Sequence, residues 1–315
     1  METDLLGPPY ERHTIDLGRD AEGPVTATLV HRRSERPTGA AVLYVHGFVD
    51  YFFQTHLADF YTDRGIDFYA LDLRKYGRSL QPHQTPNYCL SLADYYPELD
   101  EAARIIRSQD GHHRLLVNGH SMGGLLATLW AHDRRDDGLV DGLFLNSPFL
   151  DFNAPALVRK VLGPVIAEVF GRIGPHGKLP FSLNAVHGSS LRRDRHGEWD
   201  YDLAWKPLLG FPVRAGWLRA IRQGHLRVHA GLDLRVPILV ACSMASYKKA
   251  RWGEAARAAD SVLDVDHIAR WTPALGRRTT LARIEAGLHD VVLSSEPARK
   301  QVFAELAQWL SAYFV

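Results

Sequence analysis

One stretch of the chain, residues 113–130, constrains the fold more than any other. It begins with the apolar run Leu115–Val117, turns through Gly119-His120-Ser121-Met122-Gly123, and continues with small residues and leucines at helical spacing. A serine on so tight a turn takes strained backbone angles, and glycines must flank it because the neighbouring strand and helix approach closely. We therefore expect the Ser121 hydroxyl to stand clear of the backbone at the end of a sheet.

Strands and helices alternate along most of the chain. The stretches with the apolar, β-branched composition of buried strands are 40–45, 66–71, 115–117, 140–145, 236–241 and 279–284. Helical spacing is seen in 54–64, 92–107 and 297–313 and in the stretch after Ser121. This alternation predicts an α/β fold, with a mostly parallel sheet covered by helices on both faces. Residues 10–17 and 25–31 are predicted to form a preceding hairpin.

The alternation fails between residues 151 and 235. This span holds an amphipathic run, Ala156–Ile173, and then a loop-rich section dense in aromatic residues. An insertion of this size between two strands is typical of a segment that covers the carboxyl edge of a sheet. We therefore expect a core formed by residues 1–150 and 236–315 and an inserted cap, or lid, formed by residues 151–235. The alternative is a small separate domain without contact to the site.

Composition narrows the possible partners. The formal net charge of +1 gives no electrostatic reason to expect nucleic acid or an anionic membrane surface. Cys89 and Cys242 do not have the spacing of metal ligands, so we expect buried thiols, no metal and no cofactor. No apolar run approaches about 18 residues, and no signal pattern opens the sequence, so we expect a cytoplasmic protein without an integral membrane segment. The sequence leaves a homo-oligomer open.

Ser121 needs a base if it is to act as a nucleophile. In folds of this kind the partners follow in the order serine, acid, histidine. Among 16 histidines, His289 lies in a loop after the last predicted strand and before the final helix, at the sheet edge expected for Ser121. We therefore predict His289 as the base.

The acid is harder to place from the residues alone. No carboxylate follows the strand that ends near Ser243, and the first candidates come later, at Asp260 and Asp264. Asp260 is favoured, although either aspartate could instead cap or begin the following helix. Residues 244–259 resemble an insertion between strand and acid, and could form a second lid near the site.

Two backbone N–H groups are expected to face the reacting carbonyl. Met122, directly after the serine, supplies one, and Phe48, in the loop after the strand at 40–45, supplies the other. His46 is expected to brace this loop together with Gly47 rather than react. The other supporting residues are Gly119, His120 and Gly123.

These residues together resemble the α/β-hydrolase family, and more narrowly its branch of monoacylglycerol lipases, lysophospholipases and serine-aminopeptidase-like hydrolases. The matching motifs are V-H-G-F at 45–48, L-D-L-R-x-Y-G-R-S at 71–79, G-H-S-M-G-G at 119–124, L-N-S-P at 145–148, D-S-V-L-D at 260–264 and G-L-H-D at 287–290. The resemblance covers residues 25–150 and 236–315. It implies that the first aspartate of the D-x-x-x-D run, Asp260, is the acid. The loop 46–51 departs from the lipases' H-G-x-G-E-H.

The resemblance and the residues predict a serine hydrolase that cleaves a small-molecule carboxylic ester, with an apolar acyl or aryl group suggested by the aromatic residues of 151–235. The same triad could hydrolyse amides or peptides, which is the alternative within enzymes. The alternative outside enzymes is a hydrolase-like binding protein without activity, which would lack a member of the triad.

Overall fold

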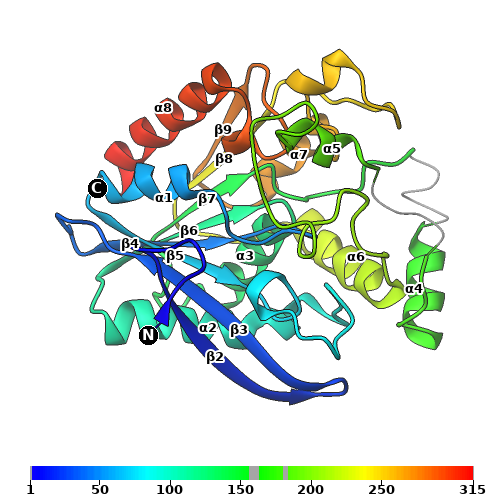
Figure 1. Ribbon diagram of the computed structural model, residues 1–315, viewed down its shortest axis with the longest axis horizontal. Coiled ribbons are helices and arrows are strands. Elements are labelled where there is room, and N and C mark those ends of the chain that lie inside the picture. Colours follow the sequence, from blue (N-terminus) through cyan, green and yellow to red (C-terminus); the bar gives the residue numbers. More distant parts are fainter. Residues whose placement is uncertain (1, 156–162, 180–183, 315) are drawn as a thin grey trace.

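The computed structural model describes residues 2–155, 163–179 and 184–314 of the chain. Within these residues nine strands form one sheet in the order β1-β2-β3-β5-β4-β6-β7-β8-β9 (Figure 1). The strands are β1 (Glu2–Thr3), β2 (Glu11–Asp20), β3 (Gly23–Arg32), β4 (Ala40–Val45), β5 (Ile66–Asp72), β6 (Arg114–His120), β7 (Gly142–Asn146), β8 (Ile238–Ser243) and β9 (Thr279–Ile284). From β5 to β9 the sheet is parallel, so the predicted fold class is confirmed.

The predicted hairpin is the antiparallel edge of this sheet. β2 and β3 are longer than expected, because β2 continues to Asp20 and leaves only two residues for the turn. The pairing register shifts between Asp16 and Arg19, which marks a bulge. β3 then pairs antiparallel with β5 and joins the hairpin to the parallel part.

Helices cover both faces of the sheet (Figure 1). The helices are α1 (Thr55–Thr62), α2 (Tyr96–Arg104), α3 (Met122–Asp133), α4 (Gly163–Ile173), α5 (Val186–Leu191), α6 (Ala215–His229), α7 (Val265–Trp271) and α8 (Glu296–Tyr313). One core cluster packs α1 and α8 against one face, and a second packs α2, α3, α6 and α7 against the other. The single helix expected over 92–107 is in fact three consecutive pieces: a 3₁₀ turn, α2 and a π turn that ends at Gln109.

The long connection between β7 and β8, residues 147–237, contains α4, α5 and α6. We call it the β7–β8 segment. The sequence pattern missed α6, whose Trp217 and Ile221 are buried in the same cluster as α3. The predicted amphipathic run Ala156–Ile173 corresponds to α4 from Gly163 onward, and residues 156–162 lie outside the described part. In Figure 1, α4 and α6 lie beyond one end of the sheet, at the right of the view.

Both cysteines are buried free thiols, as expected. None of the helices in the described ranges combines the length and the apolar composition that a membrane crossing requires.

Candidate active site

Ser121 lies on the turn between β6 and α3. Its backbone angles, φ 53° and ψ −117°, fall in the left-handed half of conformational space, which a side-chain-bearing residue rarely adopts. The turn is held because the Ser121 N–H donates to the Asn146 carbonyl at the end of β7, at 2.9 Å. Such strain persists only where the surroundings over-determine it, and it is concentrated at functional sites.

Glycines allow the strand and the helix to meet at this turn. A Cβ on Gly123 would lie 2.3 Å from the carbonyl oxygens of Val45 and His46, and one on Gly119 would lie 2.7 Å from the Gly123 carbonyl. The obstructing atoms are backbone, so they cannot give way as a flexible side chain would. The predicted need for glycine at both positions therefore has a steric cause.

The structure brings Ser121, His289 and Asp260 into one hydrogen-bonded chain. His289 Nε2 lies 2.9 Å from Ser121 Oγ, and His289 Nδ1 lies 2.9 Å from Asp260 Oδ2. An ionised carboxylate can only accept, so the Nδ1 proton points to Asp260 and leaves Nε2 to accept from the serine hydroxyl. The three residues are 7%, 3% and 0% exposed, so water is largely excluded from this chain.

Asp260 is fixed by its second oxygen. Oδ1 accepts hydrogen bonds from the backbone N–H groups of Val262 and Leu263, each at 2.8 Å. Asp260 therefore shapes its own loop and does not cap a helix. The helix cap is Asp264, whose side chain accepts from the Asp266 N–H at the start of α7. Asp264 also pairs with Lys248 at 2.7 Å, and no hydrogen bond or ion pair is found between it and His289 within the described residues.

Residues 244–259 leave the sheet and return to almost the same point. The Asp260 N–H donates to the Ala245 carbonyl, and the Tyr247 N–H donates to the Asp260 carbonyl. Between these contacts the loop reaches α5, where Trp252 Nε1 donates to Ser190 Oγ at 3.1 Å. The insertion thus places Asp260 close to the end of β8 despite its distance along the sequence.

The loop after β4 contacts the serine directly. A Cβ on Gly47 would lie 3.1 Å from Ser121 Cβ, so the backbone of this loop passes beside the hydroxyl. The Leu73 N–H donates to His46 Nε2 at 3.0 Å, which places the ring proton on Nδ1, where it donates to the Gly47 carbonyl at 2.8 Å. Burial lowers the His46 pKa below its ordinary value, and this keeps the ring neutral.

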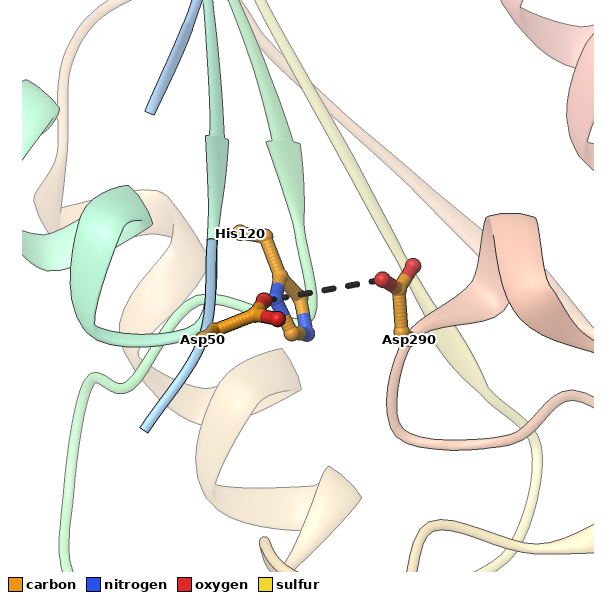
Figure 2. Close-up of side chains that lie close together, drawn as sticks. All are labelled: Asp50, His120 and Asp290. Atoms are coloured by element: carbon orange, nitrogen blue, oxygen red, sulfur yellow. Dashed lines mark hydrogen bonds and ion pairs between the residues drawn. The ribbon is translucent and has the colours of Figure 1, made fainter. Parts of the chain in front are cut away.

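A buried polar cluster adjoins the site, and the sequence analysis missed most of it. Figure 2 shows Asp50, His120 and Asp290 converging from the loop after β4, the end of β6 and the loop after β9. His120 Nδ1 lies 3.1 Å from Asp50 and 3.9 Å from Asp290. Lys206, from the β7–β8 segment, lies 2.6 Å from the other Asp50 oxygen. Asp290 could have been suspected because it follows His289, but nothing in the sequence marks Lys206.

The three side chains of Figure 2 also have the spacing of a possible metal site, since one ligand atom from each lies within 4.8 Å of the others. The contacts favour an ion-pair cluster instead, because the Lys206 ammonium supplies a cation at Asp50. Burial alone would raise the Asp50 pKa, but the charge of Lys206, followed by His120, holds it far below its ordinary value. Burial alone would lower the His120 pKa, but Asp290 and Asp50 raise it, which favours imidazolium.

A cavity of about 1190 Å³ opens at Ser121 and is large for a small-molecule site. Both parts of the chain line it: Phe48, Ser121 and His289 from the core, and Trp217 from the β7–β8 segment. The Phe48 and Trp217 rings pack with their centroids 4.1 Å apart. Further aromatic lining comes from Phe149, Phe152, Tyr201 and Trp271. The wall beside the serine is therefore mainly apolar and aromatic.

The sheet is mostly parallel, a strained serine lies between β6 and α3, and a histidine follows the last strand. This is the architecture of the α/β-hydrolases. The sequence profile of the family Hydrolase_4, described as serine aminopeptidase, S33, matches residues 36–245, and the chain belongs to this family. The predicted family is thereby confirmed.

Solved structures agree on the fold. The monoacylglycerol lipase of Paleococcus ferrophilus aligns with a TM-score of 0.66 at 19% identity, over 90% of this chain and 99% of its own. A soluble variant of the monoglyceride lipase of Saccharomyces cerevisiae aligns with a TM-score of 0.69 at 15% identity, over 95% of each chain. A thermostable carboxyl esterase from Bacillus coagulans aligns with a TM-score of 0.67 at 14% identity, over 97% of this chain and 99% of its own. No curated protein sequence matches the chain.

Proposed function

We propose that the protein is a serine hydrolase that cleaves carboxylic esters through a triad of Ser121, His289 and Asp260. The observation that carries this proposal is the hydrogen-bonded chain among these three side chains, which ends at the floor of a largely apolar cavity. Its geometry meets the requirements for activating a serine: a base within hydrogen-bond reach and an acid that orients the base.

The reaction would proceed in two halves. Ser121 Oγ attacks the ester carbonyl while His289 Nε2 takes the hydroxyl proton, and the Oγ–C bond forms as the carbonyl π pair moves onto oxygen. The intermediate collapses, the C–O bond to the alcohol breaks, and His289 returns the proton to the departing alkoxide. Water then attacks the acyl-enzyme with His289 again as base, and this releases the carboxylic acid and restores Ser121.

The oxyanion of each tetrahedral intermediate would be bound by the backbone N–H groups of Phe48 and Met122. Met122 begins α3, so its N–H lies at a helix N-terminus, where negative charge is favoured. The Phe48 N–H belongs to the loop that passes beside Ser121. Removal of one such donor in comparable sites lowers kcat by about 10²- to 10³-fold.

The substrate class follows from the cavity. We assign residues 151–235 of the β7–β8 segment as the cap, because Trp217 and Tyr201 form part of the wall of the cavity at Ser121. Their aromatic surface suits an apolar acyl or aryl group, which would be buried on binding. Lipases and an esterase among proteins of the same fold support esters of this kind.

Amide or peptide hydrolysis by the same triad is the second candidate, favoured by the description of the family as serine aminopeptidase. The two candidates differ in the leaving group, since an amine must be protonated as it departs, and a matched series of substrates separates them. Activated esters are intrinsically more reactive than anilides, so each turnover rate is divided by the rate of the uncatalysed reaction. We expect this rate enhancement to be larger for p-nitrophenyl esters than for peptide anilides of the same acyl group. A larger enhancement for the anilides would favour the second candidate.

Labelling with a fluorophosphonate probe tests the nucleophile. Wild-type protein should be labelled covalently, and Ser121→Ala should not be labelled and should lose ester turnover. Ser147→Ala is the matched control, since Ser147 is a buried serine with positive φ at the end of the neighbouring β7, and it should remain labelled. A wild-type protein that resists the probe and hydrolyses none of the esters would contradict the proposed function.

A further inference from the structure

Lys206 extends from the β7–β8 segment into the core beside the proposed site. Its Nζ lies 2.6 Å from Asp50 Oδ1, and the two side chains are 7% and 1% exposed. We propose that Lys206 is a positioning residue for the reaction at Ser121, which holds Asp50 and, through Asp50, the Gly47 N–H in the loop that carries the second oxyanion donor. The inference rests on the proposed ester hydrolysis and adds a residue outside the triad to it.

The first step is the contact from Asp50 to the loop after β4. Asp50 Oδ2 accepts from the Gly47 N–H at 3.4 Å, while the Gly47 carbonyl accepts from His46 Nδ1 at 2.8 Å. Both sides of Gly47 are therefore held, and the Phe48 N–H follows directly. Val49 has φ 52°, which is strained for a β-branched residue, so this loop keeps its shape only through such anchors.

The second step concerns the other contacts between the β7–β8 segment and the same loop. The Asp202 N–H donates to the Tyr51 hydroxyl at 2.7 Å, and the Trp205 ring packs edge-on against Tyr51 at 5.1 Å. Lys206 Nζ lies over the rings of Phe53 and Tyr201, 5.7 Å from each centroid. Substitution of Lys206 alone would remove the ion pair and leave these other contacts in place.

The third step is charge. Lys206 and His120 are the basic groups that face Asp50 and Asp290, and these two carboxylates raise the His120 pKa. Without Lys206 the cluster has one positive charge fewer near His289, which favours the protonated imidazole that cannot accept the serine proton. Among the described residues, the groups facing His289 are Asp260 from the loop after β8, His120 at the end of β6, Ser121 in the turn that follows and His187 from α5, with Asp290 next to it in the chain.

The test compares four variants of the full-length protein. Lys206→Met should lower kcat by about tenfold to a hundredfold, as expected for a displaced oxyanion donor, with a smaller effect on KM. The acidic limb of its pH–rate profile should move to higher pH by roughly half a unit or more. Lys206→Arg should keep the wild-type limb. Asp50→Asn combined with Lys206→Met should return the acidic limb to its wild-type pH, because both charged groups of the ion pair are removed. Lys178→Met, an exposed lysine of the same segment, should match wild type.

Melting temperatures test the ion pair between Lys206 and Asp50 by a measurement that does not depend on activity. Lys206→Met should melt below wild type, and the double variant should recover part of the loss because no unpaired buried carboxylate remains at position 50. Lower thermal stability with an unchanged kcat and pH–rate profile would overturn the positioning role. A raised KM for anionic esters alone would mean that Lys206 binds substrate instead. If wild type resists the fluorophosphonate probe, the proposed function fails, and the melting temperatures still show whether the ion pair anchors the loop.

Discussion

At the scale of single residues, the geometry of the site depends on which side-chain atoms are free to accept a hydrogen bond. Asp260 has both oxygens committed, one to His289 and one to two backbone N–H groups, so it cannot rotate away from the imidazole. His46 is also fixed, but by Leu73 and Gly47, and its ring faces Tyr76 instead of the serine. Two buried histidines near one serine therefore have different roles because their partners differ.

Asp260→Asn should lower kcat for esters by about 10⁴-fold, because the amide oxygen would stay on the two backbone N–H groups and the amide NH₂ would donate to Nδ1, which leaves the base in the wrong tautomer. Steady-state turnover of a p-nitrophenyl ester measures this change. Asp264→Asn serves as control and should stay within a few-fold of wild type, since Asp264 caps α7 away from the imidazole. Equal loss in both variants, or none in Asp260→Asn, would refute the assignment of the acid.

At the scale of elements, the sequence predicted the structure best where a motif directly follows a predicted strand. The strand at 40–45 has the predicted bounds because a fully buried apolar run flanked by turn residues leaves no other register, and the more exposed strand at 279–284 also has the predicted bounds. The elbow and His289 follow such strands closely, so their proximity follows from a parallel sheet, whereas Asp260 is brought to the same edge by the returning loop 244–259. α6 was missed because its buried side consists largely of small and aromatic residues within a loop-rich span. Lys206 was missed because its partner, Asp50, is 156 residues away.

The cluster of Figure 2 joins the loops after β4, β6 and β9, and its His120 makes this junction sensitive to pH. The His120 pKa is raised above its ordinary value near 6.5. The stability that imidazolium contributes is therefore fully present below that value and is lost as pH rises through the raised pKa. The free energy of unfolding, measured in denaturant between pH 7 and 9, should fall in wild type and fall less in His120→Gln. His13→Gln, on the exposed face of β2, should behave as wild type; identical slopes in all three proteins would contradict this role.

At the scale of the whole molecule, core and β7–β8 segment build one site together. The core supplies the proposed triad, and the segment supplies aromatic wall and the Lys206 cation. The structural alignments cover nine-tenths or more of the chain, so the fold that carries both parts of the site is shared with these solved structures. The substrate is the least predictable feature, because much of the cavity wall comes from the segment in which sequence periodicity breaks down.

The cavity predicts how activity changes with acyl length. Each added methylene that enters the apolar wall should raise kcat/KM by up to about fourfold, which corresponds to about 0.8 kcal/mol. The rise should stop once the cavity is filled. A series of p-nitrophenyl esters from acetate to laurate measures the trend, with Trp217→Ala as a variant that enlarges the cavity beside Phe48 and should move the optimum to longer chains. A steady decline from acetate onward would rule out an apolar acyl site.

The return of residues 244–259 to their starting point has a consequence for how such enzymes vary. Backbone hydrogen bonds tie Ala245 and Tyr247 to Asp260, so the proposed acid is held at the end of β8 by contacts at the base of the loop and not by the residues between them. Closing a longer loop adds little entropic cost, so insertions here are tolerated. The loop is therefore a natural place to lengthen, shorten or exchange. Changes at its tip would alter the cavity wall near Lys248 and α5 and leave the position of Asp260 relative to Ser121 unchanged.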